Sequence, residues 1–230
     1  MNYRGVLLKM ATEIDSPIQY FLKLDEDIIN VNQLLDKTMR ISFIKYQCIN
    51  CGKEKKIFRQ GFCYDCFYKS PEVGDWIMRP ELSTAHIDIE DRDLEYEKKV
   101  QLQPHIVYLA LSSNVKVGVT RKTQVPTRWI DQGANSALEI LEVPNRYLAG
   151  ITEVALKEHI ADKTNWRKML TNEVSETNLF EIRNELSQFI PDEAQEFYIK
   201  DNSITELNYP VLEYPLKVKS INLEKTKLFE

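Results

Sequence analysis

The alternation of apolar and polar residues is clearest in the second half of the chain. The runs HIVYLAL (105–111) and VKVGVT (115–120) are typical of strands, and the SSN between them is a turn signal. This pair therefore predicts a β-hairpin. A third strand is predicted over ALEILEVP (137–144).

Three further segments of this half are predicted to be helical. VPTRWIDQG (125–133) has a proline near its start and a glycine past its end, which is typical of a short helix. RYLAGITEVALKEHIADKT (146–164) has apolar residues at core spacing, and TNLFEIRNELSQFI (177–190) places its apolar residues on one face. Residues 196–223 are predicted as strands interrupted by Pro210 and Pro215.

The first half of the chain has a weaker pattern. Strands are predicted over GVLLKM (5–10), QYFLKL (19–24) and MRISFI (39–44). Residues 74–104 are polar and charged with little periodicity, so a connector is expected there, with a boundary near Pro104.

The composition is that of an ordinary globular protein. The chain has 230 residues, of which 43% are hydrophobic, and this is enough for a sizeable hydrophobic core. It has no apolar run long enough for a transmembrane helix, and its first residues do not resemble a signal peptide. We therefore expect no membrane association and a cytoplasmic location.

The charges are unevenly distributed along a chain whose net charge is −5. Residues 45–69 carry six positive and two negative side chains, and residues 116–128 carry four positive and no negative ones. Two basic segments in an acidic protein can form a phosphate-binding face. The alternative is a solvated surface with counter-charges nearby in the fold.

All four cysteines lie within one short segment, as the pairs CINC (48–51) and CYDC (63–66). Each C-x-x-C pair lets two sulfurs of one tight turn reach one ion, and four thiolates suit tetrahedral zinc. Gly52 and Gly61 flank the pairs where such turns need a positive φ. The spacing predicts a closed, structural zinc site with the ligands Cys48, Cys51, Cys63 and Cys66.

Two other interpretations of the cysteines are less consistent with the sequence. Two disulfides would be typical of a secreted protein, and a redox centre usually has one C-x-x-C motif rather than two. Aromatic residues are interleaved with the cysteines and either stack on bases or form a small apolar core under the metal; we favour the core. They are Tyr46, Phe58, Phe62, Tyr64, Phe67 and Tyr68.

The order of hairpin, arginine helix, strand and glutamate helix over residues 105–170 resembles the GIY-YIG nuclease domain. Tyr108 in HIVYLA matches the tyrosine of the first motif, and Lys116-Val117-Gly118 matches the second. Arg128, with Arg121 as a second candidate, matches the helix arginine. Glu153 in GITEVALK matches the glutamate, and Asn165 in KTNWR the asparagine that follows it.

The resemblance implies a role for each of these residues. Glu153 would hold Mg²⁺ or Mn²⁺, because one carboxylate plus waters suits these ions; the alternative is a helix pair with Lys157. Arg128 would bind phosphate through its planar fork, or be an exposed charge beside Trp129. Asn165 would hold the backbone near the metal, or cap a turn.

Tyr108 and Lys116, the two motif residues on the predicted strands, each have an alternative role as well. Tyr108 would orient or deprotonate the attacking water, or pack within its strand. Lys116 stands where the resemblance has a tyrosine that is often assigned as general base. A lysine can be that base only if its pKa is lowered; otherwise it is another phosphate contact.

The whole chain also resembles the bacterial family catalogued as domain of unknown function 2797. The runs CGKEKKIFRQGFCYDCF, VKVGVTRKTQVPTRWIDQGA and DKTNWRKML carry this resemblance. The family name implies no activity, only that the cysteine segment and the nuclease-like domain occur together.

The expected fold class is α+β, with a small mixed sheet and flanking helices in the GIY-YIG-like part. The expected organisation is a β-rich region (1–45), a zinc module (46–70), a connector (71–104), a GIY-YIG-like domain (105–172) and a C-terminal helix and strand extension (173–230).

Two candidate functions follow from these expectations. One is a Mg²⁺-dependent endonuclease acting on DNA or RNA; the other is a degenerate nuclease fold that serves as a binding or interaction module. A protein-binding zinc adaptor is a third interpretation.

Overall fold

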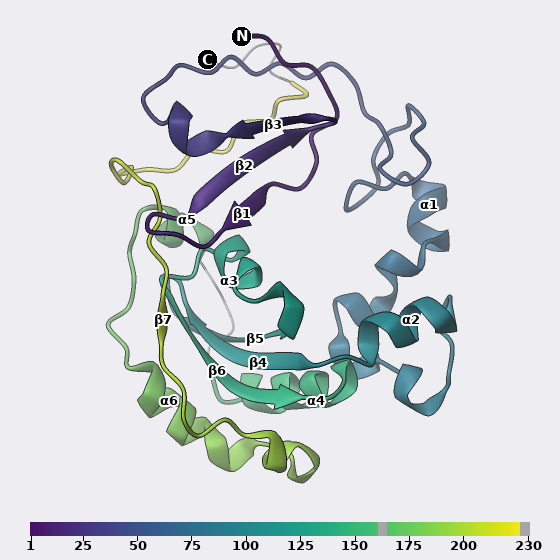
Figure 1. Ribbon diagram of the computed structural model, residues 1–230, viewed down its shortest axis with the longest axis vertical. Coiled ribbons are helices and arrows are strands. Elements are labelled where there is room, and N and C mark those ends of the chain that lie inside the picture. Colours follow the sequence, from purple (N-terminus) through teal and green to yellow (C-terminus); the bar gives the residue numbers. More distant parts are fainter. Residues whose placement is uncertain (161–164, 226–230) are drawn as a thin grey trace. The chain divides into compact units, whose positions relative to one another are not determined.

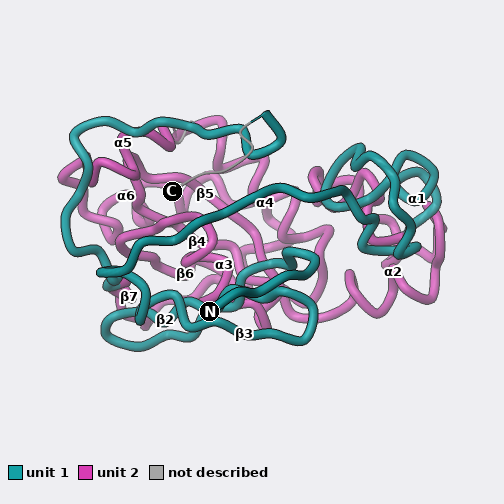
Figure 2. Tube along the Cα trace, turned by 90° about the horizontal axis from the view of Figure 1, so that it is seen from above, with its two compact units in different colours: residues 1–70, 208–230 teal, residues 71–207 magenta. Residues whose placement is uncertain are grey.

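The computed structural model describes residues 1–160 and 165–225. Its contacts divide the chain into two compact units, which are coloured separately in Figure 2. One unit comprises Met1–Ser70 and Asn208–Glu230, and the other comprises Pro71–Leu207.

The first unit contains a three-stranded antiparallel sheet in the order β1-β2-β3 (Figure 1). Its strands are β1 (Ala11–Glu13), β2 (Gln19–Leu24) and β3 (Asp27–Asn30). The amide of Asn32 joins this sheet to the preceding loop, since its Nδ2 donates to the Ile18 carbonyl at 2.8 Å and its Oδ1 accepts from the Tyr20 N–H at 3.0 Å. The same Ile18 donates its backbone N–H to the Asn208 carbonyl at 2.8 Å, so the C-terminal segment is tied to the N-terminal one.

The strand predictions for the first unit are confirmed only in part. QYFLKL is β2, with the predicted bounds. GVLLKM is not a strand but contributes a bridge between Leu7 and Leu24, and the strand lies later, at β1. MRISFI is not a strand either. The side chains of Met39, Ile41 and Phe43 are exposed, and an alternating pattern forms a strand only where one apolar face is buried.

The second unit contains a four-stranded sheet in the order β5-β4-β6-β7. Its strands are β4 (His105–Leu111), β5 (Val115–Arg121), β6 (Ser136–Val143) and β7 (Thr205–Glu206). The predicted hairpin and third strand are thus confirmed. Each described pairing is antiparallel, so the sheet is not the mixed one that we expected. Of the strands predicted over residues 196–223, only the short β7 forms, together with a bridge between Tyr198 and Leu141.

The helices of this unit are α2 (Leu94–Gln101), α3 (Thr127–Asp131), α4 (Arg146–Lys157), α5 (Trp166–Leu170) and α6 (Leu179–Leu186). Asn145 starts α4 by accepting the Leu148 N–H at 2.9 Å, which is the role of an N-cap. The helix predicted over 146–164 is confirmed for its α4 part, and its last four residues lie outside the described residues. The helix predicted over 177–190 is confirmed as α6, which continues into a 3₁₀ turn at Ser187–Phe189.

The core lies on one face of this sheet. Val107, Leu109 and Leu111 of β4 belong to it, together with Ala149 and Leu156 of α4 and apolar residues of α6. Because side chains alternate along a strand, Ile106, Tyr108 and Ala110 face the other side. Figure 1 shows α3 and α4 on opposite sides of the sheet, so Tyr108 lies on the side of α3.

The expected connector is an ordered part of the second unit. It forms four 3₁₀ turns between Pro71 and Ile87, followed by α2. The Glu97 side chain is fully buried, and its carboxylate accepts the N–H groups of Asp91, Arg92 and Asp93 at 2.7–3.0 Å. Short 3₁₀ turns have no long hydrophobic period, so the pattern gives no sign of them.

Candidate functional sites

The first cysteine pair lies in a tight turn. The Gly52 N–H donates to the Cys48 carbonyl at 2.9 Å, and the turn requires a φ of +66° at Gly52. A second turn precedes the other pair, where Gly61 has a φ of +84° and its carbonyl accepts the Ile49 N–H at 3.0 Å. The hydrogen bond between Ile49 and Gly61 joins the two turns. Both glycines have the positive φ that the sequence predicted for turns beside the cysteine pairs.

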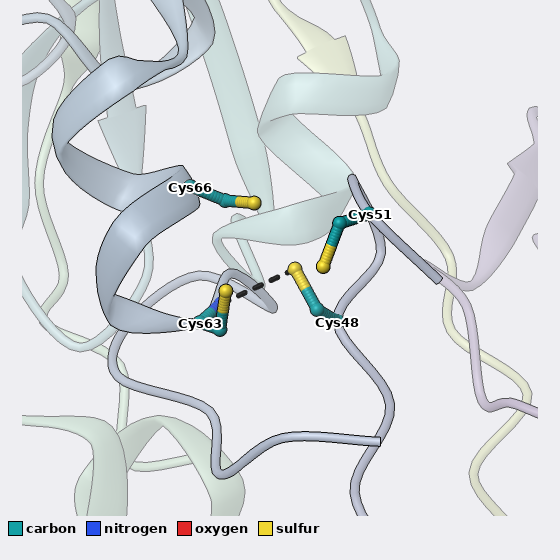
Figure 3. Close-up of side chains that lie close together, drawn as sticks. All are labelled: Cys48, Cys51, Cys63 and Cys66. Atoms are coloured by element: carbon teal, nitrogen blue, oxygen red, sulfur yellow. Dashed lines mark hydrogen bonds between the residues drawn. The ribbon is translucent and has the colours of Figure 1, made fainter. Parts of the chain in front are cut away.

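The second pair is positioned by a helix. Cys63 is the N-cap of α1 (Tyr64–Lys69), and Cys66 lies in the first turn of that helix. Figure 3 shows the side chains of all four cysteines directed toward one another. Their sulfurs lie within 4.8 Å of one another. Tetrahedral zinc with bonds of about 2.3 Å would separate sulfurs by roughly 3.8 Å, so a small contraction suffices to bind the ion.

The surroundings of Cys48 lower the pKa of its thiol and so favour the negatively charged thiolate. Burial favours its neutral thiol, but backbone N–H groups of Cys51, Cys63 and Asn50 outweigh burial and lower the pKa of Cys48 to about 6. The Cys63 N–H lies 3.3 Å from the Cys48 sulfur (Figure 3). The thiolate is the form that binds metal, so these amides favour a metal ligand.

The chemistry of this donor set fits a metal such as zinc. The four cysteines are free thiols, which disagrees with the alternative of two disulfides. Four sulfur ligands leave no open coordination position, so such a site stabilises a fold and does not activate water.

The aromatic residues beside the cysteines do not all form the small core that we expected. Phe62 is buried, and Phe67 is partly buried. Phe58, Tyr64 and Tyr68 are exposed by 41%, 61% and 54%. The core interpretation is therefore wrong for these three rings.

A second cluster surrounds Tyr108, whose side chain is fully buried in β4. Its cross-strand partner is Gly118 of β5, and a Cβ at Gly118 would lie 2.7 Å from the Tyr108 hydroxyl oxygen. The Tyr108 hydroxyl donates to Oε1 of Gln132 at 3.0 Å, and its ring meets Trp129 edge-on at 5.9 Å. The glycine of the second motif thus leaves the space that this tyrosine ring occupies.

Charged groups reach Tyr108 from two helices. Burial raises the pKa of Tyr108 to about 12, the positive charge and hydrogen bond of Arg128 act against this rise, and the negative charge of Glu153 adds to it. Arg128 belongs to α3 and Glu153 to α4. Arg128, from the helix on the Tyr108 side of the sheet, and Glu153, from the helix on the other side, therefore both act electrostatically on Tyr108, and we call the three the Tyr108 neighbourhood.

Arg146 is a further member of this neighbourhood that the sequence did not suggest. Its Nε donates to the Trp76 carbonyl at 3.0 Å and its NH2 group to the Ile77 carbonyl at 2.8 Å. Burial lowers the pKa of Arg146 to about 10; the charge of Glu153 opposes this, and those of Arg121 and Arg128 add to it. No local pattern marks Arg146, because its partners lie about 70 residues earlier in the chain.

Glu153 also makes the helix pair that the sequence offered as an alternative. Its Oε1 lies 3.0 Å from the Lys157 Nζ, and 12% of its side chain is exposed. Lys116 is paired with Ala110, the position after the Tyr108–Gly118 pair on the same face of the sheet, and is partly buried.

Asn165 has a different setting from the other candidate residues. Its Oδ1 accepts the N–H groups of Arg167 and Lys168 at 3.1 and 3.3 Å, so it caps α5. Its own N–H donates to Ser113 Oγ at 3.1 Å, in the turn between β4 and β5. Asn165 therefore has the capping role that the sequence offered as an alternative, and its side-chain oxygen is already bonded to backbone N–H groups.

Comparison with known proteins gives one match. The family model described as "Protein of unknown function (DUF2797)" matches residues 36–230. No curated protein and no solved structure is significantly similar to the chain. Within residues 1–160 and 165–225, no helix has the length and apolar character that crossing a bilayer requires.

Proposed function

The chain belongs to the DUF2797 family, and we propose that it is a zinc-containing nucleic-acid-binding protein that hydrolyses phosphodiester bonds. The observation that carries this proposal is the neighbourhood of Tyr108, Arg128 and Glu153. The three come from β4, α3 and α4, and the charges of Arg128 and Glu153 both act on the Tyr108 hydroxyl. A tyrosine hydroxyl, a guanidinium and a carboxylate are groups that can orient water, bind phosphate and hold a cation in phosphodiester hydrolysis.

Arg128 supplies the contact to the scissile phosphate in this proposal. Its side chain is exposed, and a guanidinium binds phosphate oxygens through two parallel hydrogen bonds. Arg121 adds positive charge, since both arginines act on the pKa of Arg146. Arg146 itself is committed to the carbonyls of the 71–104 segment and holds that segment beside the site.

Tyr108 acts as a hydrogen-bond acceptor in this proposal, because its single O–H proton is donated to Gln132 Oε1. With a pKa of about 12 its hydroxyl stays protonated at neutral pH, so it would orient the attacking water by accepting a hydrogen bond from it and would not deprotonate it. Gln132 fixes the direction of that hydroxyl at 3.0 Å. Lys116, on the same face, contacts the substrate phosphate.

Glu153 would hold the divalent cation, which when bound stabilises the charge of the phosphate and the leaving oxygen. A single partly exposed carboxylate fits Mg²⁺ or Mn²⁺, because these ions keep several waters. Arg146 and Lys157 already act on this carboxylate, so their positive charges oppose a second cation. Phosphate from the substrate reduces this repulsion, and we therefore expect the ion to bind tightly only together with nucleic acid.

The test is a cleavage assay with supercoiled, linear and single-stranded substrates in the presence of Mg²⁺ or Mn²⁺. Glu153→Gln should lower the cleavage rate by about two orders of magnitude or more. Its fold should persist, because an i,i+4 ion pair contributes only about 0.5 kcal/mol. Glu158→Gln, a change of an exposed carboxylate just past α4, is the matched control and should cleave like wild type. Equal cleavage by wild type and Glu153→Gln would place the activity elsewhere.

A second candidate function is favoured by two observations. Glu153 is paired with Lys157, and Lys116 stands where the resemblance has a tyrosine. Both suit a protein that binds nucleic acid without cutting it. In that case wild type cleaves no substrate, while Arg128→Ala and Lys116→Ala each reduce the salt dependence of binding by about one unit of slope. Absence of salt-dependent binding to any DNA or RNA would contradict both functions.

A further inference from the structure

Three exposed aromatic rings form one cluster beside the cysteine site. We call Phe58, Tyr64 and Tyr68 the aromatic patch. The ring centroids lie 5.3 Å apart for Phe58 and Tyr64, 4.8 Å for Tyr64 and Tyr68, and 5.9 Å for Phe58 and Tyr68. Phe67 supports the patch, with its ring 5.2 Å from Phe58 and 5.4 Å from Tyr68. The three rings thus form one continuous surface, and the Phe67 ring packs against two of them.

The aromatic patch is not needed to fill the core of the cysteine module. Phe62 and the side chains of Cys48 and Cys63 are buried there, whereas the three patch rings are about half exposed. Contiguous exposed apolar surface generally marks an interaction site. The patch lies on α1 and on the segment that precedes the second cysteine pair, so a bound metal would hold both parts rigid.

The segment that carries the patch is rich in positive charge, and one of its cations contacts a patch ring. The two acidic residues of segment 45–69 are each paired with a lysine: Glu54 with Lys45 at 2.9 Å and Asp65 with Lys55 at 2.7 Å. This leaves Lys53, Lys56, Arg59 and Lys69 as additional cations. Arg59 lies over the Phe58 ring, with its Cζ 5.5 Å from the centroid. These four charges exceed the two negative charges of a zinc ion with four thiolates.

We propose that the aromatic patch stacks on unpaired bases of single-stranded nucleic acid, while Arg59 and the other cations of segment 45–69 hold the phosphates. Exposed rings with interleaved cations are the combination that binds single strands, because every base has a π-face. A duplex does not offer these faces, since its bases are stacked on one another. The proposal rests on the nucleic-acid binding proposed above but not on cleavage.

The size of the patch limits what it binds. Three ring centroids within 5.9 Å of one another present faces to one or two adjacent bases. Stacking is largely indifferent to base identity, so little sequence preference is expected from this surface. Its effect is to select strands with unpaired bases.

The test measures binding of the full chain, without added magnesium, to three labelled ligands of equal length. They are an oligothymidylate, the same backbone without bases, and a duplex. The double variant Tyr64→Leu/Tyr68→Leu should bind the oligothymidylate more weakly by roughly 5- to 150-fold per ring lost. Its binding to the abasic backbone should not change. Tyr3→Leu, which alters an exposed tyrosine outside the cysteine module, is the matched control and should bind all three ligands like wild type.

Charge variants separate the cations from the rings. Lys53→Gln and Lys56→Gln should each reduce the salt slope by about one unit on both single-stranded ligands, whereas the tyrosine variant should leave the slope unchanged. Equal loss on the abasic backbone, or equally tight ring-dependent binding to the duplex, would overturn the proposal, as would no binding to any single strand. Base-dependent binding without cleavage would leave it standing and reject only the hydrolase activity.

Discussion

His105 shows at the scale of one residue how burial changes chemistry. Its ring is fully buried at the start of β4, and its Nδ1 lies 2.7 Å from the Gln103 carbonyl. Burial lowers the pKa of His105 to about 4; the Gln103 carbonyl opposes this, and the positive charges of Arg146 and Arg121 add to it. The imidazole is therefore neutral in the folded protein at any pH near neutrality.

This shift predicts how stability depends on pH. The unfolded imidazole takes up its proton near pH 6.5 and the folded one near pH 4, so the unfolded state binds more protons between these values. The contribution is complete above pH 6.5 and is lost as the pH falls toward 4, at a total cost of about 3 kcal/mol. Urea unfolding across this range should show a smaller pH slope for His105→Gln than for wild type. Equal slopes in wild type and His105→Gln would contradict the prediction.

At the same scale, the sequence identified the cysteine ligands but not the environment of the other candidate residues. The C-x-x-C pairs are local turns, so their spacing is sufficient to predict that the four sulfurs meet. Gln132 and Arg146 became part of the Tyr108 neighbourhood only through contacts between distant segments. Asn165 illustrates the opposite case, since its cap on α5 uses neighbours two and three residues away.

At the scale of elements, the close approach of α4 to the 71–104 segment depends on one residue. A Cβ at Gly150 would lie 2.2 Å from the Glu81 backbone N and 2.3 Å from the Pro80 carbonyl carbon. Backbone atoms cannot move aside as a flexible side chain can. The missing side chain at Gly150 therefore allows the helix to contact this segment directly.

Gly150→Ala tests this contact. In an exposed helix the change from glycine to alanine stabilises by up to about 1 kcal/mol. Here we expect the opposite sign, with a loss of about 1–3 kcal/mol, because overpacking forces the backbone apart. Urea unfolding followed by tryptophan fluorescence measures it, since Trp76 is buried in the same segment. Val154→Ala, on the exposed face of α4, should change the free energy of unfolding by only about 0.5 kcal/mol, and a stabilised Gly150→Ala would refute the close approach.

At the scale of the whole molecule, the metal ligands and the tryptophans belong to different units. The four cysteines lie in the first unit, while Trp76, Trp129 and Trp166 lie in the second. The core around β4, β5 and β6 is built from residues of the second unit alone. The two units can therefore be followed with different signals.

Metal removal should affect the two units unequally. Purified protein should contain one zinc ion per chain, and Cys48→Ser or a chelator should remove it and destabilise the cysteine module, because metal binding there is folding energy. The tryptophan emission and its urea midpoint should stay at wild-type values. Metal analysis and tryptophan fluorescence on the same samples check both statements, and readdition of zinc to the chelated protein is the control. Metal-free protein prepared without chelator, or two disulfides in its mass spectrum, would contradict the zinc site.

The sequence by itself determined the features that depend on near neighbours. The hairpin of β4 and β5, the strand β6 and the helices α4 and α6 follow from hydrophobic period, α3 follows from the proline and glycine at its ends, and the sulfur cluster follows from ligand spacing. The tertiary structure alone decided that residues 5–10 and 39–44 are not strands, that residues 71–104 fold against α4, and that three aromatic rings of the cysteine module face solvent. The reason is physical. A strand needs a partner, a 3₁₀ turn has no long period, and the exposure of a ring depends on which distant segments cover it.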